Sequence, residues 1–391
     1  MLNLARKLWS HGKDVPARSF SFHRPLLLIQ SDDWGRVGVR DREGYEQLRD
    51  NGIPLGQNPY DLYTLETAED VSALAEMLRQ HRDSTGRSAC LLMNFVLANV
   101  DFPRTRRNNY QQIHLRSLTE GLPGNWKRPG LFEAYRKGIG DGLFYPALHG
   151  LTHFCQQSVR NHLANQDERG ALLRTLYKAE TPYIYWRMPW VGYEYCNPEP
   201  PRAGFLPAQT QEALIAAAAE SFQEFFSRPP LSACAPGYRA NRETRVAWSK
   251  QGVRIAQNGS GSPLPPHFDD CEILNLHRTI DVEPSQRELP IEKYVQLADG
   301  CFARGVPTIV SVHSINFHST LKDFRGPTLR ALDEFLSALE RKYPDLLYVH
   351  DADVYDIVSR GEFETSQGKV SVTVRQAPGE FRSATTTEGL T

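Results

Sequence analysis

The chain has 391 residues, and its 45 lysines and arginines against 46 aspartates and glutamates give a formal net charge of −1. This balance, with no basic cluster, gives no reason to expect a nucleic acid or an anionic membrane as a partner. The length allows one large barrel domain or two ordinary domains.

The six cysteines are scattered and form no Cys-x-x-Cys pair. This pattern predicts buried free thiols instead of a zinc-thiolate site or a disulfide framework. No apolar window reaches the length of a membrane-spanning helix, and residues 1–24 lack the apolar region of a signal peptide. We therefore expect a cytoplasmic protein without a membrane span.

The first strong pattern is an apolar run that ends in two carboxylates. Leu26 to Ile29 are apolar throughout, and Asp32 and Asp33 follow directly. Such a run predicts a strand that is buried on both faces, as in a parallel sheet, and the carboxyl ends of these strands are where such folds place their chemistry. By itself, Asp-Asp-Trp-Gly fits a solvated turn as well.

Further apolar runs alternate with helical patterns along the rest of the chain. Strands are predicted within 90–100, 143–154, 231–239, 254–257, 274–282, 308–313 and 346–349. Helices are predicted over 67–81, 129–137, 159–178, 209–226, 242–251, 291–304, 329–342 and 354–360. This alternation without a linker predicts one α/β barrel domain over 25–362, after a polar lead-in at 1–24. Residues 363–391 form a polar tail that is expected to be disordered or a single edge strand.

Four predicted strand ends carry polar side chains, namely Asp32 and Asp33, His149 and His153, Arg239, and His313. The strand ends of a barrel converge on one mouth, and carboxylate with imidazole is a ligand set that suits zinc, iron or cobalt. His149 and His153 are four residues apart, so their rings share a face if this segment begins a helix. A His-x-x-x-His pair is weak evidence by itself in a chain with 12 histidines.

The order of these motifs resembles that of a known family. Asp32-Asp33, His149-Gly-Leu-Thr-His153, Ala235-Pro-Gly-Tyr-Arg239 and Ser311-Val-His313 follow one another as in the polysaccharide deacetylase family, the carbohydrate esterases with NodB homology. The resemblance covers about residues 25 to 360 and is that of an outlying branch. The family usually has Thr-Phe before the two acids, and its arginine usually precedes the proline.

The resemblance implies a deformed (β/α) barrel of the polysaccharide deacetylase type. It implies a divalent metal ion, zinc in the first place, held by Asp33, His149 and His153. It also implies Asp32 as catalytic base, His313 as catalytic acid and Arg239 as the arginine that orients the base. The acid that supports the catalytic histidine has no clear match, and Asp281 and Glu283 are the candidates.

These roles agree with simple chemistry. A metal lowers the pKa of bound water, Asp32 can take a proton from that water, and His313 can protonate a departing amine. The sequence thus predicts a metal-dependent hydrolase that removes an acetyl or other acyl group from an N-acetylated carbohydrate. A hydrolase of a non-sugar amide and a catalytically silent glycan-binding protein are the alternatives.

Other polar and aromatic residues could line the mouth of the barrel. Asn94, Asn99, Asn316 and Gln257 are either polar groups of the site or, as we favour, ordinary hydrogen-bonded amides of loops. The segment 182–207 predicts an irregular aromatic loop. Its aromatic side chains could pack on a sugar ring or simply cap the barrel, and they include Tyr183, Tyr185, Trp186 and Trp190.

Overall fold

The structure is a computed structural model that describes residues 17–199, 203–261 and 263–379. Within these ranges, no helix is both long enough and apolar enough to cross a membrane. All six cysteines are free thiols, of which Cys196 and Cys271 are half-buried and the others buried.

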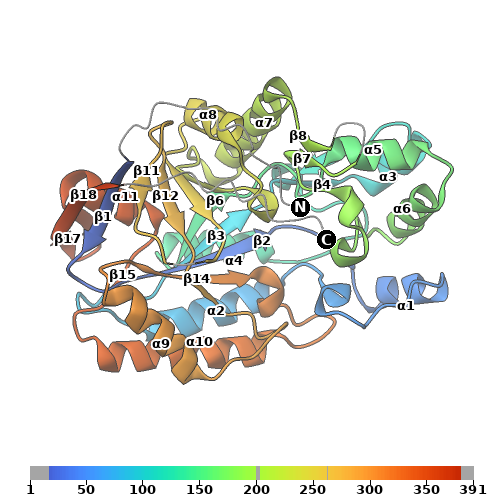
Figure 1. The fold of residues 1–391 in the computed structure, drawn as a ribbon. Helices are drawn as coiled ribbons and strands as arrows, with labels where there is room; N and C mark the ends of the chain where they lie inside the picture. The colour runs from blue at the N-terminus through green and yellow to red at the C-terminus, as the bar shows by residue number, and fades with distance from the viewer. Residues whose placement is uncertain (1–16, 200–202, 262, 380–391) are drawn as a thin grey trace, which may run out of the picture.

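A run of parallel strands forms the centre of the molecule (Figure 1). In spatial order they are β13 (Ile280–Asp281), β14 (Thr308–His313), β2 (Leu26–Trp34), β3 (Leu91–Phe95), β6 (Phe144–Leu148), β9 (Ser232–Cys234), β10 (Ile255–Asn258) and β12 (Leu274–His277). A further short strand, β15 (Leu347–Tyr348), pairs with the start of β2. Every residue of β2 is buried, as expected for a strand that is covered on both faces.

The parallel run closes on itself through one segment of chain. Strands β12 and β13 are at opposite ends of the run, yet only Arg278 and Thr279 separate them in the sequence. The backbone N–H of Arg278 donates to the carbonyl oxygen of Asn258 in β10, next to β12, and that of Thr279 donates to the carbonyl oxygen of Ile309 in β14, next to β13. Residues 274–281 therefore bridge the two edges, and the predicted deformed α/β barrel is confirmed.

The two ends of the described chain extend this sheet. Strand β11 (His267–Phe268) pairs with β12, β1 (Ala17–Phe22) pairs with β11, and β18 (Val374–Gly379) pairs with β1, all antiparallel. Strands β16 (Glu362–Thr365) and β17 (Gly368–Ser371) form a hairpin before β18. The described parts of the predicted lead-in and tail are therefore strands of the fold, whereas residues 1–16 and 380–391 of those segments lie outside the described ranges.

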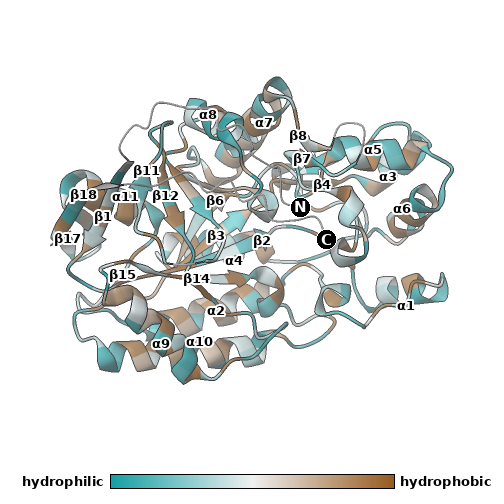
Figure 2. Ribbon diagram, viewed as in Figure 1, coloured by the Kyte–Doolittle hydropathy of each residue, from teal (hydrophilic) through white to brown (hydrophobic). Residues whose placement is uncertain are grey.

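Helices cover the outside of the curved sheet. They are α1 (Arg42–Asp50), α2 (Ala68–Gln80), α3 (Phe102–Arg107), α4 (Leu131–Gly140), α5 (Gln156–Ala164), α6 (Glu168–Lys178), α7 (Ala208–Phe226), α8 (Arg242–Lys250), α9 (Ile291–Phe302), α10 (Arg325–Lys342) and α11 (Asp351–Arg360). Helices α2, α9 and α10 lie along one side of the sheet, and α7 and α8 lie on the other side (Figure 1). Figure 2 shows hydrophilic and hydrophobic stretches alternating along α9 and α10, as expected for helices that bury one face.

Capping residues set the ends of several helices. Thr67 and Asp70 form a reciprocal cap at the start of α2, as the predicted helix boundary at Thr67 requires. The range 159–178 was predicted as one helix, which is wrong. The helix ends at Ala164, and α6 starts anew after Asp167, whose side chain accepts a hydrogen bond from the backbone N–H of Gly170 at 2.8 Å. Two small antiparallel pairs complete the fold, β4 (Ala98–Val100) with β5 (Leu115–Ser117) and β7 (Cys196–Asn197) with β8 (Gly204–Phe205).

Candidate active site

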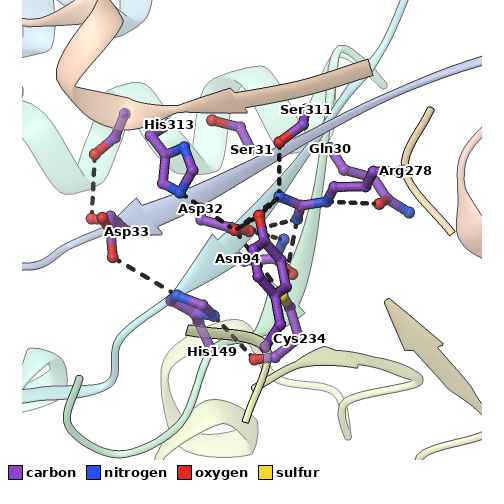
Figure 3. Close-up of polar contacts among 12 residues, drawn as sticks. Gln30, Ser31, Asp32, Asp33, Asn94, His149, Cys234, Arg278, Ser311 and His313 are labelled. Carbon is purple, nitrogen blue, oxygen red and sulfur yellow. Dashed lines mark hydrogen bonds and ion pairs between the residues drawn. The ribbon is translucent and has the colours of Figure 1, made fainter. Parts of the chain in front are cut away.

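The two carboxylates at the end of β2 point in different directions (Figure 3). Asp33 has a φ of 73°, in the left-handed region that non-glycine residues rarely occupy. Its carbonyl oxygen accepts hydrogen bonds from the hydroxyls of Tyr63 at 2.8 Å and Ser314 at 3.3 Å, which hold this conformation. The backbone thus directs Asp32 and Asp33 toward different sets of neighbours.

Asp33, His149 and His153 meet at one point, as predicted. The Oδ1 atom of Asp33 lies 3.6 Å from Nε2 of His149 and 3.2 Å from Nε2 of His153. All three residues are buried, and one ligand atom from each lies within 4.8 Å of the others. Two imidazoles and one carboxylate are the protein ligands of many catalytic zinc sites.

The hydrogen bond of His149 fits a metal ligand. Nδ1 of His149 lies 2.9 Å from the carbonyl oxygen of Cys234, which can only accept, so Nδ1 carries the proton of the neutral ring. The Nε2 lone pair therefore faces Asp33 Oδ1, a buried atom without a hydrogen-bond partner among the described residues. Burial lowers the pKa of His153 well below its usual value, which favours the neutral form that binds metals.

Arg36 occupies the other side of Asp33. Its Nη2 atom lies 3.4 Å from Oδ2 of Asp33, and its Nη1 atom donates to the hydroxyl of Tyr183 at 2.8 Å. Burial alone would raise the pKa of Asp33, but the charge of Arg36 holds it well below its usual range. Asp33 is therefore ionised at neutral pH, and Oδ1 is the oxygen that it can offer to a cation.

A loop, and not a helix, carries the two histidines. Helix α5 begins only at Gln156, so the condition under which His149 and His153 would share a helical face is not met. Gly150 has a φ of 88°, which turns the chain directly after β6. The carboxylate of Glu194 then accepts hydrogen bonds from the backbone N–H groups of residues 151 and 152, at 3.0 and 2.7 Å, and so fixes the loop.

A buried arginine holds Asp32. Arg278 donates from Nη1 to Oδ2 at 2.7 Å and from Nη2 to Oδ1 at 2.5 Å, and Asn94 donates to Oδ1 at 2.7 Å (Figure 3). The Arg278 side chain is 0% exposed. Burial would raise the pKa of Asp32, but the charge and hydrogen bonds of Arg278 hold it well below its usual range. Asp32 is therefore ionised and can accept a proton.

Arg239, which was expected to orient Asp32, lies elsewhere. It is exposed, and among the described residues no hydrogen bond or ion pair joins it to Asp32. The preceding residue, Tyr238, reaches the site instead, because its hydroxyl donates to Asp32 Oδ2 at 3.2 Å and accepts from Arg278 at 2.7 Å. The contact that the resemblance assigned to Arg239 is thus made by Arg278.

A second group of possible ligands shares residues with the first. Suitable ligand atoms of Asp32, His149 and Cys234 also lie within 4.8 Å of one another. Arg278 and Asn94 already occupy the oxygens of Asp32, and burial raises the pKa of the Cys234 thiol well above its usual value. The cluster around Asp33 is therefore the better metal site.

His313 lies across the site from the histidine pair. Its Nε2 atom is 3.8 Å from Oδ2 of Asp32, and its Nδ1 atom is 2.5 Å from Oε1 of Glu283. Burial would lower the pKa of His313, but Glu283 and next Asp32 raise it to about 9. Of the two candidate supporting acids, Glu283 makes the contact, whereas Asp281 is exposed and accepts from the hydroxyl of Ser260.

The four amide residues divide into two groups. Asn94 and Gln257 belong to the site, because they bond each other twice and Asn94 also bonds Asp32. Asn99, in β4, and Asn316, in the turn after β14, do not contact Asp32 or the Asp33 cluster among the described residues, and both are hydrogen-bonded amides. The former bonds the backbone of residues 35 and 37, and the latter bonds Glu283 and the backbone of residues 285 and 313.

The aromatic loop does not wall the mouth as a group. Tyr183 is buried behind His153, and its hydroxyl lies 2.8 Å from Nδ1 of that ring. Trp190 is buried against the ring of His162. Trp186 is 37% exposed and donates to Asp61, and the side chain of Tyr185 lies outside the described part. Trp190 is therefore a packing residue, whereas Tyr183 contacts Arg36 and His153 from behind the site through its hydroxyl.

Comparisons with known proteins give similar folds only. No protein-family model matches the chain, and no curated protein matches it either. A probable polysaccharide deacetylase from Pseudomonas aeruginosa PAO1 is 13% identical, with a TM-score of 0.45, over 87% of this chain and 92% of its own. PuuE allantoinase is 12% identical, with a TM-score of 0.44, over 87% and 92%.

A family 4 carbohydrate esterase from Streptomyces lividans is 12% identical, with a TM-score of 0.33, over 83% of this chain and 92% of its own. Polysaccharide deacetylases and carbohydrate esterases, the family that the sequence motifs resemble, are thus among the similar solved structures. Because these TM-scores are below 0.5, the similarities establish no activity, and the function has to be inferred from the site.

Proposed function

We propose that this protein is a metal-dependent hydrolase that removes an acetyl or other acyl group from an N-acetylated carbohydrate. The observation that carries the proposal is the convergence of Asp33, His149 and His153 on one point, where Oδ1 of Asp33 has no hydrogen-bond partner in the described part of the chain. A carboxylate held by an arginine, Asp32, and an imidazole held by a carboxylate, His313, lie beside this point. These are the groups that amide hydrolysis needs.

Asp33, His149 and His153 would hold the cation, and the donor set of two nitrogens and one oxygen suits zinc. When bound, a divalent cation supplies Lewis acidity to water and to an acyl oxygen. Asp32 is ionised and takes the proton from the attacking water, while Arg278 keeps its carboxylate in place.

His313 delivers the proton that the leaving amine requires. Its Nδ1 is bound to Glu283, so Nε2 is the atom that faces Asp32 and the substrate. The raised pKa keeps this nitrogen protonated at neutral pH. The proposed base and acid lie close together, with Oδ2 of Asp32 3.8 Å from Nε2 of His313. This distance allows both groups to act on one amide bond.

Metal content tests the proposal directly. Protein that has been stripped with a chelator and dialysed against zinc should hold about one ion per chain. Asp33→Ala and His149→Ala should each abolish this binding, since each removes a ligand. His162→Ala is the matched control, because this buried histidine on α5 packs against Trp190 outside the site. Full zinc occupancy in the two ligand variants would overturn the assignment.

Substrate panels separate the remaining alternatives. Acetate release from N-acetylated sugars, against small non-sugar amides, distinguishes a carbohydrate deacetylase from another amide hydrolase. Asp32→Asn should abolish turnover while zinc binding remains. If no added metal gives turnover and Asp32→Asn leaves sugar binding intact, the protein is a silent glycan-binding protein instead.

A further inference from the structure

Asp351 is a buried carboxylate that lies outside the proposed site. It is the first residue of α11 and is 0% exposed. Its Oδ1 atom accepts a hydrogen bond from Nε2 of Gln30 at 2.7 Å, and its Oδ2 atom accepts from the hydroxyl of Ser232. Neither partner belongs to the groups proposed for catalysis, so the role of this buried charge needs another explanation.

The first connection from Asp351 leads to Arg278 through Gln30. The Nε atom of Arg278 donates to Oε1 of Gln30 at 3.1 Å (Figure 3). A guanidinium can only donate and an ionised carboxylate can only accept. Gln30 lies between the two, so its amide has one orientation, with the oxygen toward Arg278 and the nitrogen toward Asp351.

The second connection leads through Ser232 and Gln257 to the same guanidinium. The hydroxyl of Ser232 donates to Asp351 and accepts from Nε2 of Gln257 at 3.0 Å. Oε1 of Gln257 accepts from Nη2 of Arg278 at 3.2 Å. This chain of bonds runs in the same direction as the first, because it also begins at a group that only donates and ends at one that only accepts.

We propose that Asp351 is a positioning residue whose carboxylate orients the amides of Gln30 and Gln257, so that their oxygens hold Arg278 against Asp32. The proposal deepens the proposed function and rests on it for its catalytic consequence. Burial raises the pKa of Asp351 to about 6, although the hydrogen bonds from Ser232 and Gln30 oppose this rise. Because this pKa is still below 7, the carboxylate is mostly ionised at neutral pH.

Asp351→Asn tests the proposal with little change in volume. The side-chain amide of the new asparagine has one oxygen that accepts and one nitrogen that only donates. Either Gln30 or Ser232 therefore faces a donor in place of an acceptor, and the hydrogen bonds of that connection have to reverse or break. We expect kcat to fall about 10- to 100-fold, while KM and zinc content stay nearly unchanged. An unchanged kcat would overturn the proposal.

Asp353→Asn is the matched control. Asp353 lies on the same helix and is 4% exposed, and its carboxylate pairs with Arg87 at 2.6 Å, away from Arg278. This substitution also removes a buried charge, so it reports the general cost in folding stability. Its kcat should equal that of the wild type. A loss of kcat in Asp353→Asn as large as in Asp351→Asn would assign the effect to stability and overturn the proposal.

A readout without turnover separates the proposal from the proposed function. The Nε–H proton NMR signal of Arg278, identified by its loss in Arg278→Lys, should shift and exchange at least about 10-fold faster with water in Asp351→Asn. Asp353→Asn should leave the signal unchanged. A shifted signal in a protein without acyl hydrolysis would reject the function and keep the positioning role, whereas an unmoved signal would reject the positioning role.

If Asp351→Asn does not fold, Gln30→Leu replaces it. This variant removes one connection and leaves Asp351 and its bond to Ser232 in place. The Nε–H signal of Arg278 should again shift, because Nε loses the oxygen that accepts its proton. An unmoved signal in Gln30→Leu would equally overturn the proposal.

Discussion

At the scale of single residues, one carboxylate decides where His313 titrates. Burial by itself would lower the pKa of this imidazole, and Glu283 is the largest of the groups that raise it to about 9. Because folding raises this pKa, the protonated His313 stabilises the folded state. This contribution to the free energy of unfolding is fully present below about pH 6.5 and is lost as the pH rises through about 9. The protonated form that a catalytic acid needs is lost over the same upper range.

Glu283→Gln should therefore change the pH profile of the reaction. In the wild type, kcat should fall above about pH 9, where His313 loses its proton. In the variant, the alkaline limb should move down by at least about one pH unit, because the amide no longer favours the imidazolium. Profiles of kcat between pH 5 and about pH 10 would measure the shift.

Asp281→Asn is the control for this profile. Asp281 lies two residues before Glu283 and is exposed, with Ser260 as its partner. Its loss should leave the alkaline limb in place. A limb that stays fixed in Glu283→Gln, or moves equally in both variants, would show that His313 is not the titrating acid.

The contrast between Arg239 and Arg278 shows what a sequence motif can and cannot predict about a single residue of the site. The motif order predicted an arginine beside Asp32, but the motif itself pointed to Arg239, which is exposed. A usable signal was present in the strand predicted over 274–282. Leu276, Arg278 and Ile280 alternate with more exposed residues, so Arg278 lies in register with buried positions. A buried arginine requires a carboxylate partner, and Asp32 is that partner.

At the scale of elements, parallel topology explains why four distant residues could be placed from the sequence. Strands β2, β6 and β14 run in the same direction, so the residues at or just after their carboxyl ends, Asp32, Asp33, His149 and His313, meet at one edge. The conformation of the loop after β6 was not predictable in the same way. It depends on Glu194, a residue far along the chain that carried no motif.

Glu194→Ala should weaken metal binding without removing a ligand. The loss of its carboxylate leaves the backbone N–H groups of residues 151 and 152 without their acceptor, so the loop that carries His149 and His153 is no longer fixed. We expect zinc affinity to fall about 10- to 100-fold, as measured by competition with a fluorescent chelator.

Glu180→Ala is the comparison for this experiment. Glu180 is 1% exposed and accepts from the backbone N–H of Asn125 at 2.7 Å, so its substitution also frees a backbone donor. It should lower the free energy of unfolding by about 1 to 3 kcal/mol and leave zinc affinity unchanged. Equal affinities in the two variants would show that the bonds of Glu194 do not position the ligands.

At the scale of the whole molecule, the strand and helix alternation predicted the barrel, but the ends of the chain were predicted less well. Strand β1 contains Phe20 and Phe22, two isolated apolar residues among polar ones, and both are buried in the fold. β18 contains few apolar residues, so its sequence resembles a polar tail. Six residue pairs join the two strands. Pairing between segments more than 350 residues apart leaves no local signal in the sequence.

Removal of residues 374–391 should therefore destabilise the fold while the site remains. The deletion removes β18, so β1 loses six paired residues and becomes an unprotected edge of the sheet next to Phe20 and Phe22. We expect the free energy of unfolding to fall by at least about 2 kcal/mol, from lost hydrogen bonds and exposed apolar area. Denaturant titration would measure this loss, and zinc affinity below the unfolding transition should be unchanged.

A deletion of residues 380–391 keeps every described strand and is the control. Equal unfolding midpoints in the two deletions would mean that β18 does not stabilise the barrel, and a parallel loss of zinc affinity would mean that the ends of the chain support the site as well.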